Sequence, residues 1–220
     1  ATELAVFHEE DVAAIPNSLS YEEAACIPCA GVTAWHALIS SGRIKAGDDV
    51  LILGSGGVSI FGLQIALMNG ARVLAISSND KKLEKLRELG ASITINYKNT
   101  PDWDQQILLE TANTGVDHVL EVVGESTMER SIHATAIQGN ISVVGDLSGA
   151  LSQLGTSKRG IRLSEIVVGS RMMMEQLLRA ITLHSKKPVI DRIFSFVELR
   201  DALSYLERGV HVGKVVIKFD

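Results

Sequence analysis

The chain of 220 residues is long enough for one large domain, or for one domain with part of a second. Its apolar fraction of 46% is ordinary for an α/β protein with a full core, and its net charge of −5 argues against a nucleic-acid surface. Two cysteines make no disulfide framework and no secretory signal is visible, so we expect a cytoplasmic protein.

The first residues predict the edge of a domain rather than a complete one. The short apolar runs 3–7 and 12–15 predict strand edges without a sheet to join, which indicates a missing N-terminal partner. A helix is predicted to follow, because Ser20 can cap its N-terminus and Glu23, three residues on, completes a capping box. A second helical pattern runs over about 31–40.

The segment 49–70 combines a strand, a glycine-rich turn and a helix. Residues 50–53 are a continuous apolar run, which predicts a strand buried on both faces of a parallel sheet. Gly54, Gly56 and Gly57 follow at once. In this context the glycines let the backbone approach a pyrophosphate, and the helix N-terminus offers free N–H groups and a positive dipole end. The segment therefore predicts a dinucleotide-binding turn.

Two other interpretations of this segment compete with the phosphate site. Gln64, Asn69 and the glycines disfavour a membrane-spanning helix. A glycine turn that only packs a helix against a sheet stays open, although the flanking strand and helix favour the phosphate site. Ser59 stands where the motif has its third glycine, and its small side chain still permits close packing of helix and strand.

Strand–helix units repeat after the turn. Strands are predicted at 72–76, 92–95, 118–123, 141–145 and 165–168, and helices at 58–69, 81–89, 103–112, 126–137 and 171–184. With the first strand, these units predict an α/β fold with a doubly wound, parallel, six-stranded Rossmann sheet in the order 3-2-1-4-5-6. The ligand is expected over the switch point between strands 1 and 4. Residues 187–220 do not continue the strand–helix alternation. They are predicted to form an extended segment, a helix at 197–206 and a strand at 215–218.

The end of the second strand predicts the choice of cofactor. Ser77 stands 23 residues after Gly54, where an NAD site usually places an Asp or Glu that binds the ribose hydroxyls. Ser77, Ser78 and Lys82 suit a 2′-phosphate, because no carboxylate repels it and the lysine supplies charge. We therefore expect NADP(H) to be preferred over NAD(H). A helix cap with a solvated basic turn is the open alternative, and Asp80 would serve the ribose if the turn is shifted.

The cysteines and histidines give no metal or nucleophile signature of their own. Cys26 and Cys29 form a C-x-x-C pair, but the sheet is not of the thioredoxin type and no second pair completes a zinc site. We expect both to be small buried residues. The six histidines lack metal-binding spacing, and His36 and His118 are expected to be structural. No nucleophile elbow is present around the glycine turn.

Taken together, these residues resemble the medium-chain dehydrogenase/reductase superfamily, in the branch of quinone oxidoreductases and zinc-type alcohol dehydrogenases. The matching segments are 19–35, 47–57, 95–98, 115–118, 121–124 and 213–217. The resemblance implies an NAD(P)H-dependent oxidoreductase that transfers hydride between nicotinamide and a carbonyl, alcohol, quinone or activated alkene. It also implies three parts: a remnant of a GroES-like catalytic domain at 1–20, a Rossmann domain at 21–186, and a return to the catalytic domain at 187–220. The chain alone is then expected to bind cofactor with little turnover.

The resemblance also places the cofactor and the metal. It implies pyrophosphate at the glycine turn, the 2′-phosphate near the second strand, the adenosine near Tyr97, and the nicotinamide near Thr33. The expected cofactor contacts are Thr33, Gly54, Ser55, Gly56, Gly57, Val58, Ser77, Ser78, Lys82, Tyr97, Val123, Gly145, Leu147, Val168, Gly169 and Ser170. Cys29 holds the place of a catalytic zinc ligand in zinc-dependent relatives. We favour the zinc-free relatives, and no general acid is assigned.

The same resemblance implies the partners of the protein, and two other functions compete with it. We expect a small-molecule substrate, no nucleic acid, no membrane, and a homodimer through the sixth strand at the edge 167–168. A Rossmann-type methyltransferase also uses a glycine turn, but it usually keeps an acidic residue where Ser77 stands. A catalytically silent nucleotide-binding protein is the third possibility.

Overall fold

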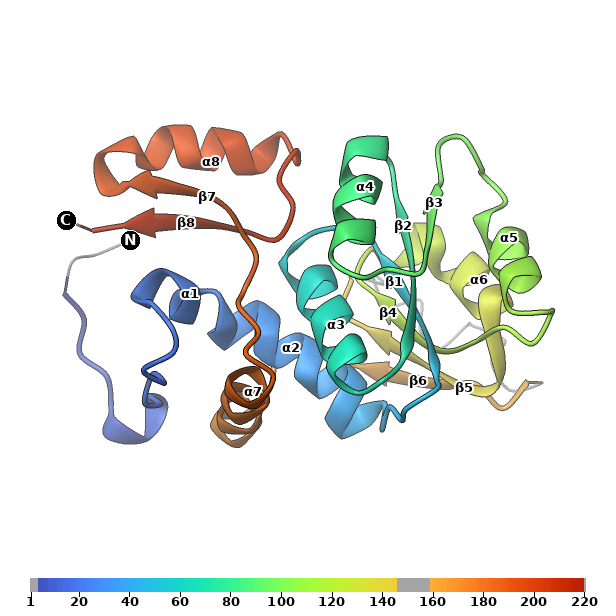
Figure 1. The fold of residues 1–220 in the computed structure, drawn as a ribbon, viewed down its shortest axis with the longest axis horizontal. Helices are drawn as coiled ribbons and strands as arrows, with labels where there is room; N and C mark the ends of the chain where they lie inside the picture. Colours follow the sequence, from blue (N-terminus) through green and yellow to red (C-terminus); the bar gives the residue numbers. More distant parts are fainter. Residues whose placement is uncertain (1–3, 146–158, 220) are drawn as a thin grey trace.

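The computed structural model describes residues 4–145 and 159–219, and two sheets organise them (Figure 1). The larger is a parallel sheet in the order β3-β2-β1-β4-β5-β6, which confirms the predicted fold class and strand order. The smaller pairs β7 with β8. Among the described residues, no helix combines the length and the apolar character that crossing a membrane requires.

The six strands run through the middle of the larger part. Their bounds are β1 Asp49–Leu53, β2 Arg72–Ser77, β3 Ile93–Asn96, β4 Val116–Glu121, β5 Thr135–Val143 and β6 Arg162–Glu165. Val50 to Leu53 are fully buried, as their apolar run predicts, because helices cover both faces of the sheet. Val50 pairs with Val73 on one side and with His118 on the other, so the chain reverses its strand order at β1.

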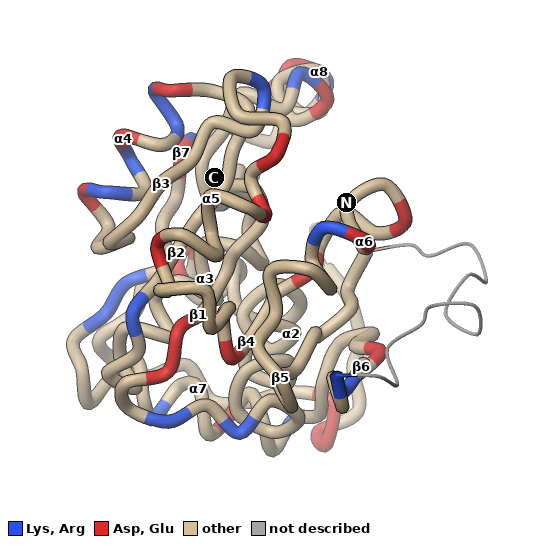
Figure 2. Tube along the Cα trace, turned by 90° about the vertical axis from the view of Figure 1, so that its right-hand side faces the viewer, with Lys and Arg blue, Asp and Glu red and all other residues tan. Residues whose placement is uncertain are grey.

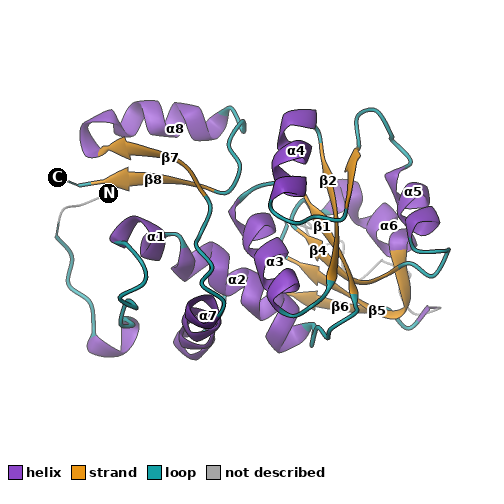
Figure 3. Cartoon of the chain, viewed as in Figure 1, coloured by secondary structure: helices purple, strands orange, loops and turns teal. Residues whose placement is uncertain are grey.

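Helices pack on both faces of this sheet (Figure 3). Their bounds are α1 Tyr21–Ala25, α2 Val32–Trp35, α3 Gly57–Met68, α4 Asp80–Glu88, α5 Trp103–Glu110, α6 Glu125–Ala134 and α7 Arg171–Leu183, with π-helical turns at η2 Ile27–Gly31 and η3 His36–Ser41. One hydrophobic core joins α2, α3, α4 and α7 to the sheet, and a second joins α5 and α6 to its other face. Acidic and basic residues are interspersed along α4 (Figure 2).

The last part of the chain forms the smaller sheet, with α8 beside it (Figure 1). Its elements are β7 Ile190–Ser195, η6 Phe196–Glu198, α8 Leu199–Glu207 and β8 Lys214–Lys218. The Phe194 and Tyr205 rings pack at 5.7 Å between centroids, and Arg192 lies over both. This sheet touches the larger one at the glycine turn, where Gly56 and Gly213 form a parallel bridge.

Several helix ends confirm the sequence analysis. The Ser20 side chain and the Glu23 side chain form the predicted capping box, with bonds of 3.2 Å and 2.8 Å to each other's backbone N–H. Gly70 and Gly90 adopt the left-handed conformation that ends a helix, with φ of 74° and 111°. The helical pattern predicted over 31–40 lies inside one continuous helical stretch at 21–41.

Among the described residues, the N-terminal apolar runs belong to neither sheet, which agrees with the prediction of strand edges without a sheet to join. Residues 4–15 form extended chain around a 3₁₀ turn, η1 Glu9–Asp11, and Leu4 and Val6 are almost fully exposed. An apolar run becomes a strand only where it joins a ladder with a neighbouring backbone, and neither sheet of the described residues includes 4–15.

The bounds of β5 and β6 also differ from the prediction. β5 begins at Thr135 rather than at 141, so residues predicted as the end of a helix belong to a strand with an irregular register. β6 covers Arg162–Glu165 instead of 165–168, because its polar residues pair with β5 while the apolar run after it leaves the sheet. The predicted dimer edge at 167–168 therefore lies beyond the strand, with Val167 exposed.

Candidate dinucleotide-binding site

The glycine turn lies at the end of β1 and opens α3. Gly54 has a φ of 77°, and its N–H donates to the Ile76 carbonyl at 2.8 Å, which fixes the turn against β2. Gly56 precedes the first helical residue, and a Cβ there would meet no atom within 4 Å. The turn therefore leaves open space in front of the helix N-terminus, where backbone N–H groups and the dipole favour an anion. This geometry fits the predicted pyrophosphate position at Ser55 and Val58.

The serine at position 59, where the glycine motif has its third glycine, has a structural explanation. Its hydroxyl is buried and donates to the Leu53 carbonyl at 2.7 Å, so the first turn of α3 is fastened to the end of β1. Close packing of the helix on the sheet depends instead on Gly62, where a Cβ would lie 2.4 Å from Cδ2 of Leu120. α3 is buried nearly all round rather than along a single stripe.

Lys214 is a cation at this turn that sequence reasoning missed. A Cβ on Gly57 would lie 2.6 Å from Cδ and 3.6 Å from Nζ of Lys214, so the lysine crosses directly over the first turn of α3. The Gly213 N–H donates to the Ser55 carbonyl at 2.9 Å and holds the lysine there. The two segments are about 160 residues apart in the sequence, and the bridge between Gly56 and Gly213 joins them.

The end of β2 carries no carboxylate in the predicted ribose position. Ser77 is buried, its carbonyl accepts from the Tyr97 N–H at 3.1 Å, and Ser78 is half-buried beyond it. Asp80 is the first residue of α4, and its Oδ1 accepts from Nδ2 of Asn96 at 2.6 Å. The nearest carboxylate is thus engaged with β3.

Lys82 is bound to the C-terminal part of the chain. Its Nζ donates to the Gly209 carbonyl, and burial lowers its pKa while Asp191 acts in the opposite direction. His211 lies close by: burial, Lys82 and Lys214 lower its pKa, and its Nδ1 is buried with no hydrogen-bond partner among the described residues. The structure therefore gathers three basic side chains: Lys82 from α4, His211 from the loop before β8, and Lys214 from the first position of β8.

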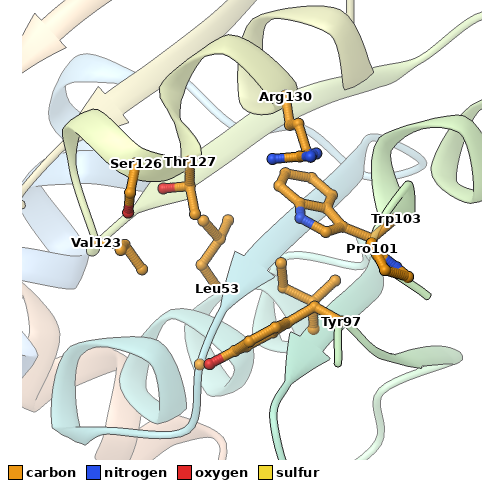
Figure 4. A pocket seen from close by; sticks show the side chains of 10 residues that line it. Leu53, Tyr97, Pro101, Trp103, Val123, Ser126, Thr127 and Arg130 are labelled. Atoms are coloured by element: carbon orange, nitrogen blue, oxygen red, sulfur yellow. The ribbon is translucent and has the colours of Figure 1, made fainter. Parts of the chain in front are cut away.

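A cavity of about 380 Å³ adjoins the glycine turn on the face of the sheet covered by α5 and α6 (Figure 4). Its walls combine aliphatic, aromatic and polar side chains: Leu53, Ile76, Tyr97, Pro101, Trp103, Val123, Ser126, Thr127 and Arg130, with Gly54. Figure 4 shows the rings of Tyr97 and Trp103 on two sides of the space. Sequence reasoning named Gly54, Tyr97 and Val123 here. It missed Trp103 and Arg130, because no local motif marks them.

The loop after β4 is built on a buried carboxylate. Glu121 is fully buried, and its Oε1 accepts from the N–H groups of Val123 and Gly124 at 2.9 Å and 3.0 Å and from the Thr127 hydroxyl at 2.8 Å. Its Oε2 accepts from the Ser131 hydroxyl at 2.5 Å. Four donors thus fix the loop after β4, which we call the switch-point loop. The sequence did not reveal this role of Glu121.

Two of the predicted nicotinamide contacts meet at this loop. A Cβ on Gly145 would lie 2.5 Å from the carbonyl carbon of Val123, so the ends of β4 and β5 touch there. The N–H groups of Val144 and Gly145 both donate to the Glu121 carbonyl. Leu147, predicted beside them, lies outside the described residues.

The other predicted nicotinamide contacts meet at α2. The Thr33 hydroxyl is buried and donates to the Cys29 carbonyl at 2.7 Å. A Cβ on Gly169 would lie 2.6 Å from Cγ1 of Val32, and the Val168 carbonyl is 2.7 Å from Nδ1 of His36. Thr33, Val168, Gly169 and Ser170 therefore belong to one corner of the fold, and His36 has the structural role expected of it.

The two cysteines differ from each other. Cys26 is buried, its thiol donates to the Glu22 carbonyl, and burial raises its pKa. Cys29 is exposed, so the expectation that both are buried is wrong for this residue, because the chain's helical turn points it outward. Within 4–145 and 159–219, no three His, Cys, Asp or Glu side chains gather as a metal site would require.

Comparison with known proteins places this site in a family. The model of the family described as zinc-binding dehydrogenase matches residues 57–182, more than half of the chain. A zinc-type alcohol dehydrogenase-like protein of Schizosaccharomyces pombe is 43% identical over 216 residues, which are 93% of this chain and 62% of that protein.

Two solved structures share the fold. The crystal structure of an NAD-dependent alcohol dehydrogenase is 31% identical with a TM-score of 0.88, and covers 96% of this chain and 63% of its own. The CurK enoyl reductase is 27% identical with a TM-score of 0.84, over 96% and 66%. The chain thus spans a little over three fifths of the length of these relatives. It belongs to the zinc-binding dehydrogenase family of the medium-chain dehydrogenase/reductase superfamily.

Proposed function

We propose that the protein is an NADP(H)-dependent oxidoreductase that moves hydride between nicotinamide and a carbonyl, alcohol, quinone or activated alkene. The observation that carries this proposal is the open glycine turn at the N-terminus of α3 with Lys214 across it. A helix N-terminus and a lysine together provide two independent attractions for a pyrophosphate. The relatives described above are an alcohol dehydrogenase-like protein, an alcohol dehydrogenase and an enoyl reductase, which supports hydride transfer.

The cavity of Figure 4 is proposed to take the adenine. It is bounded by aromatic rings and aliphatic side chains and lies next to Gly54, so a purine there would continue into the phosphates at the turn. The Arg130 side chain is half-exposed at its rim and ion-paired with Asp104 at 3.7 Å. It would close one face of the ring system by stacking.

The 2′-phosphate is proposed to lie at Ser77 and Ser78, with Lys82 as the nearest cation. Support comes from the absence of a carboxylate at the end of β2 within the described residues, and from the engagement of Asp80 by Asn96. Lys82 would bind the phosphate by turning from the Gly209 carbonyl, which is a small rearrangement for a long side chain. NADP(H) is therefore preferred over NAD(H) in this proposal.

The reacting end of the cofactor is proposed to lie between Val123, Gly145 and the Thr33 corner. When bound, the nicotinamide supplies the hydride chemistry, and the chain supplies position and electrostatics. Glu121 would hold the loop at Val123 in one conformation. Because Gly145 has no side chain, it would leave room for the nicotinamide beside Val123. The substrate is proposed to be a small molecule. The protein is also proposed to form a homodimer and to be cytoplasmic.

Calorimetric titration with NADPH and with S-adenosylmethionine tests the proposal against the methyltransferase alternative. NADPH is expected to bind and S-adenosylmethionine is not. Gly57→Val should abolish NADPH binding, because its side chain would displace Lys214 and fill the space before α3. Ala46→Val, on the exposed loop before β1, is the matched control and should bind normally. Binding of S-adenosylmethionine alone would refute the proposal. NADPH binding by a full-length enzyme that turns over neither quinones nor aldehydes would favour a silent nucleotide-binding protein.

Zinc is proposed to be absent from this chain. Cys29 could serve as one ligand of a catalytic zinc, but a tetrahedral site needs three protein ligands and the described residues place no others beside it. We expect elemental analysis of protein purified without chelator to give less than about 0.1 zinc per chain. One tightly held zinc per chain, lost in Cys29→Ser, would instead establish the zinc-dependent alternative.

A further inference from the structure

A second cavity lies at the edge of the sheet where the strands begin. Its volume is about 470 Å³, and its walls come from the loop before β1 and from the first residues of β4, β5 and β6. Parallel strands all start at one edge and end at the other, so the length of β1 separates this cavity from the glycine turn. Five residues of strand span about 16 Å. The cavity is therefore distinct from the dinucleotide site.

Three cationic side chains line this cavity. Arg43 comes from the loop after η3, Lys45 from the same loop, and Arg162 from the start of β6. All three residues are exposed, and none of their side chains has a hydrogen bond or ion pair with the described residues. Cations that come together from two separate segments repel one another unless an anion lies between them.

The carboxylates of the same cavity are already engaged. Asp48 Oδ2 accepts from the Lys45 N–H at 2.8 Å and lies 3.0 Å from Nε2 of His118. Asp117 Oδ2 accepts from the Asp49 N–H at 2.8 Å. These carboxylates fix the loop and the start of β4, so they offset part of the positive charge while the guanidinium and ammonium groups stay available.

His118 adds a buried polar group in the wall. The residue is 5% exposed, and its Nδ1 has no hydrogen-bond partner among the described residues. Buried polar side-chain atoms in folded proteins are nearly always paired. The Nε2 contact with Asp48 at 3.0 Å holds the imidazole ring in the cavity wall.

Two residues of the wall have a left-handed backbone. Arg43 has a φ of 59° and Gln138 a φ of 64°, a conformation that costs energy for residues other than glycine, asparagine and aspartate. Such conformations persist where the surrounding structure requires them, and they gather at ligand-binding positions. Arg43 lies in the loop before β1 and Gln138 in the irregular first half of β5, and both line this cavity.

We propose that this cavity binds a small polyanion, a metabolite that carries a phosphate group or several carboxylates. The three cationic side chains provide the charge complement, and planar guanidinium groups suit either anion. The volume suits one small molecule. The site is independent of the proposed function, because none of its residues belongs to the dinucleotide site.

Amide chemical shifts of ¹⁵N-labelled protein, titrated separately with inorganic phosphate and with citrate, test this site. We expect saturable shifts at the amides of Arg43, Lys45, Gln138 and Gly139 with at least one of the two anions, with a dissociation constant of about 1 mM or lower. The anion that binds more tightly distinguishes a phosphate-bearing ligand from a polycarboxylate. The double variant Arg43→Gln/Arg162→Gln should weaken this binding at least about tenfold.

The control is Arg87→Gln/Arg200→Gln, which removes the same charge from exposed positions on α4 and α8 and should bind as the unmutated protein does. Anions that bind only at the glycine turn would shift residues 54–58 and leave the cavity unchanged, which would overturn the proposal. So would shifts that fail to saturate with both anions, or equal weakening in the two double variants.

Discussion

Ser77→Asp is expected to reverse the order of cofactor affinity. The substitution places a carboxylate at the buried end of β2, where it would repel a 2′-phosphate and could accept from the ribose hydroxyls of NADH. Loss of one charge-assisted hydrogen bond costs about 1.5–3 kcal/mol, and the added repulsion acts in the same direction. NADPH affinity should fall about a hundredfold or more, while NADH affinity should stay equal or rise, as measured by nicotinamide fluorescence.

Two further variants control this experiment. Ser77→Asn has nearly the shape of the aspartate without its charge, so it should lower NADPH affinity by only a few fold. Asp80→Asn tests whether Asp80 holds the ribose, and we expect NADH affinity to stay unchanged, because Asp80 is bound to Asn96. Equal losses in Ser77→Asp and Ser77→Asn would show that the end of β2 acts through shape alone.

Glu121→Ala is expected to cause the largest loss of stability among single substitutions at the site. It removes the acceptor for Val123, Gly124, Thr127 and Ser131 at once. An unpaired buried donor costs about 1–3 kcal/mol, and water can reach part of the space, so we expect a loss of about 4 kcal/mol in the free energy of unfolding. For a chain of this size that is a fall in Tm of roughly 8–16 °C.

The measurement is thermal and urea denaturation, with two variants beside it. Glu121→Gln keeps Oε1 and should lose only about 1 kcal/mol. Glu129→Ala, at an exposed position of α6, should change stability by less than about 0.5 kcal/mol. If Glu121→Ala were no less stable than Glu129→Ala, the buried carboxylate would not be what fixes the switch-point loop.

The sequence predicted the central parts of the fold because those parts depend on local signals. Continuous apolar runs identify β1 and its neighbours, and the pattern at 49–70 identifies the succession of strand, glycine turn and helix. The capping box at Ser20 and the left-handed helix stops at Gly70 and Gly90 are equally local. Each of these features depends on residues within about a dozen positions, which the chain itself displays.

The errors occur where neighbours decide the structure. The polar β6 pairs through its backbone with β5, so its sequence carries little of the apolar signal by which a buried strand is recognised. Lys214, Trp103 and Glu121 were missed as site residues for a related reason. Their roles arise from contacts with distant segments or from donors that only the folded loop supplies.

The most direct test of this account is a fluorescence titration of the unmutated protein with NADPH and NADH under identical salt and pH. The glycine turn, Lys214 and the carboxylate-free end of β2 together predict that NADPH binds, about tenfold to a hundredfold more tightly than NADH. Failure of both cofactors to bind would contradict the dinucleotide site itself. Equal affinities, or a preference for NADH, would contradict the role assigned to Ser77, Ser78 and Lys82.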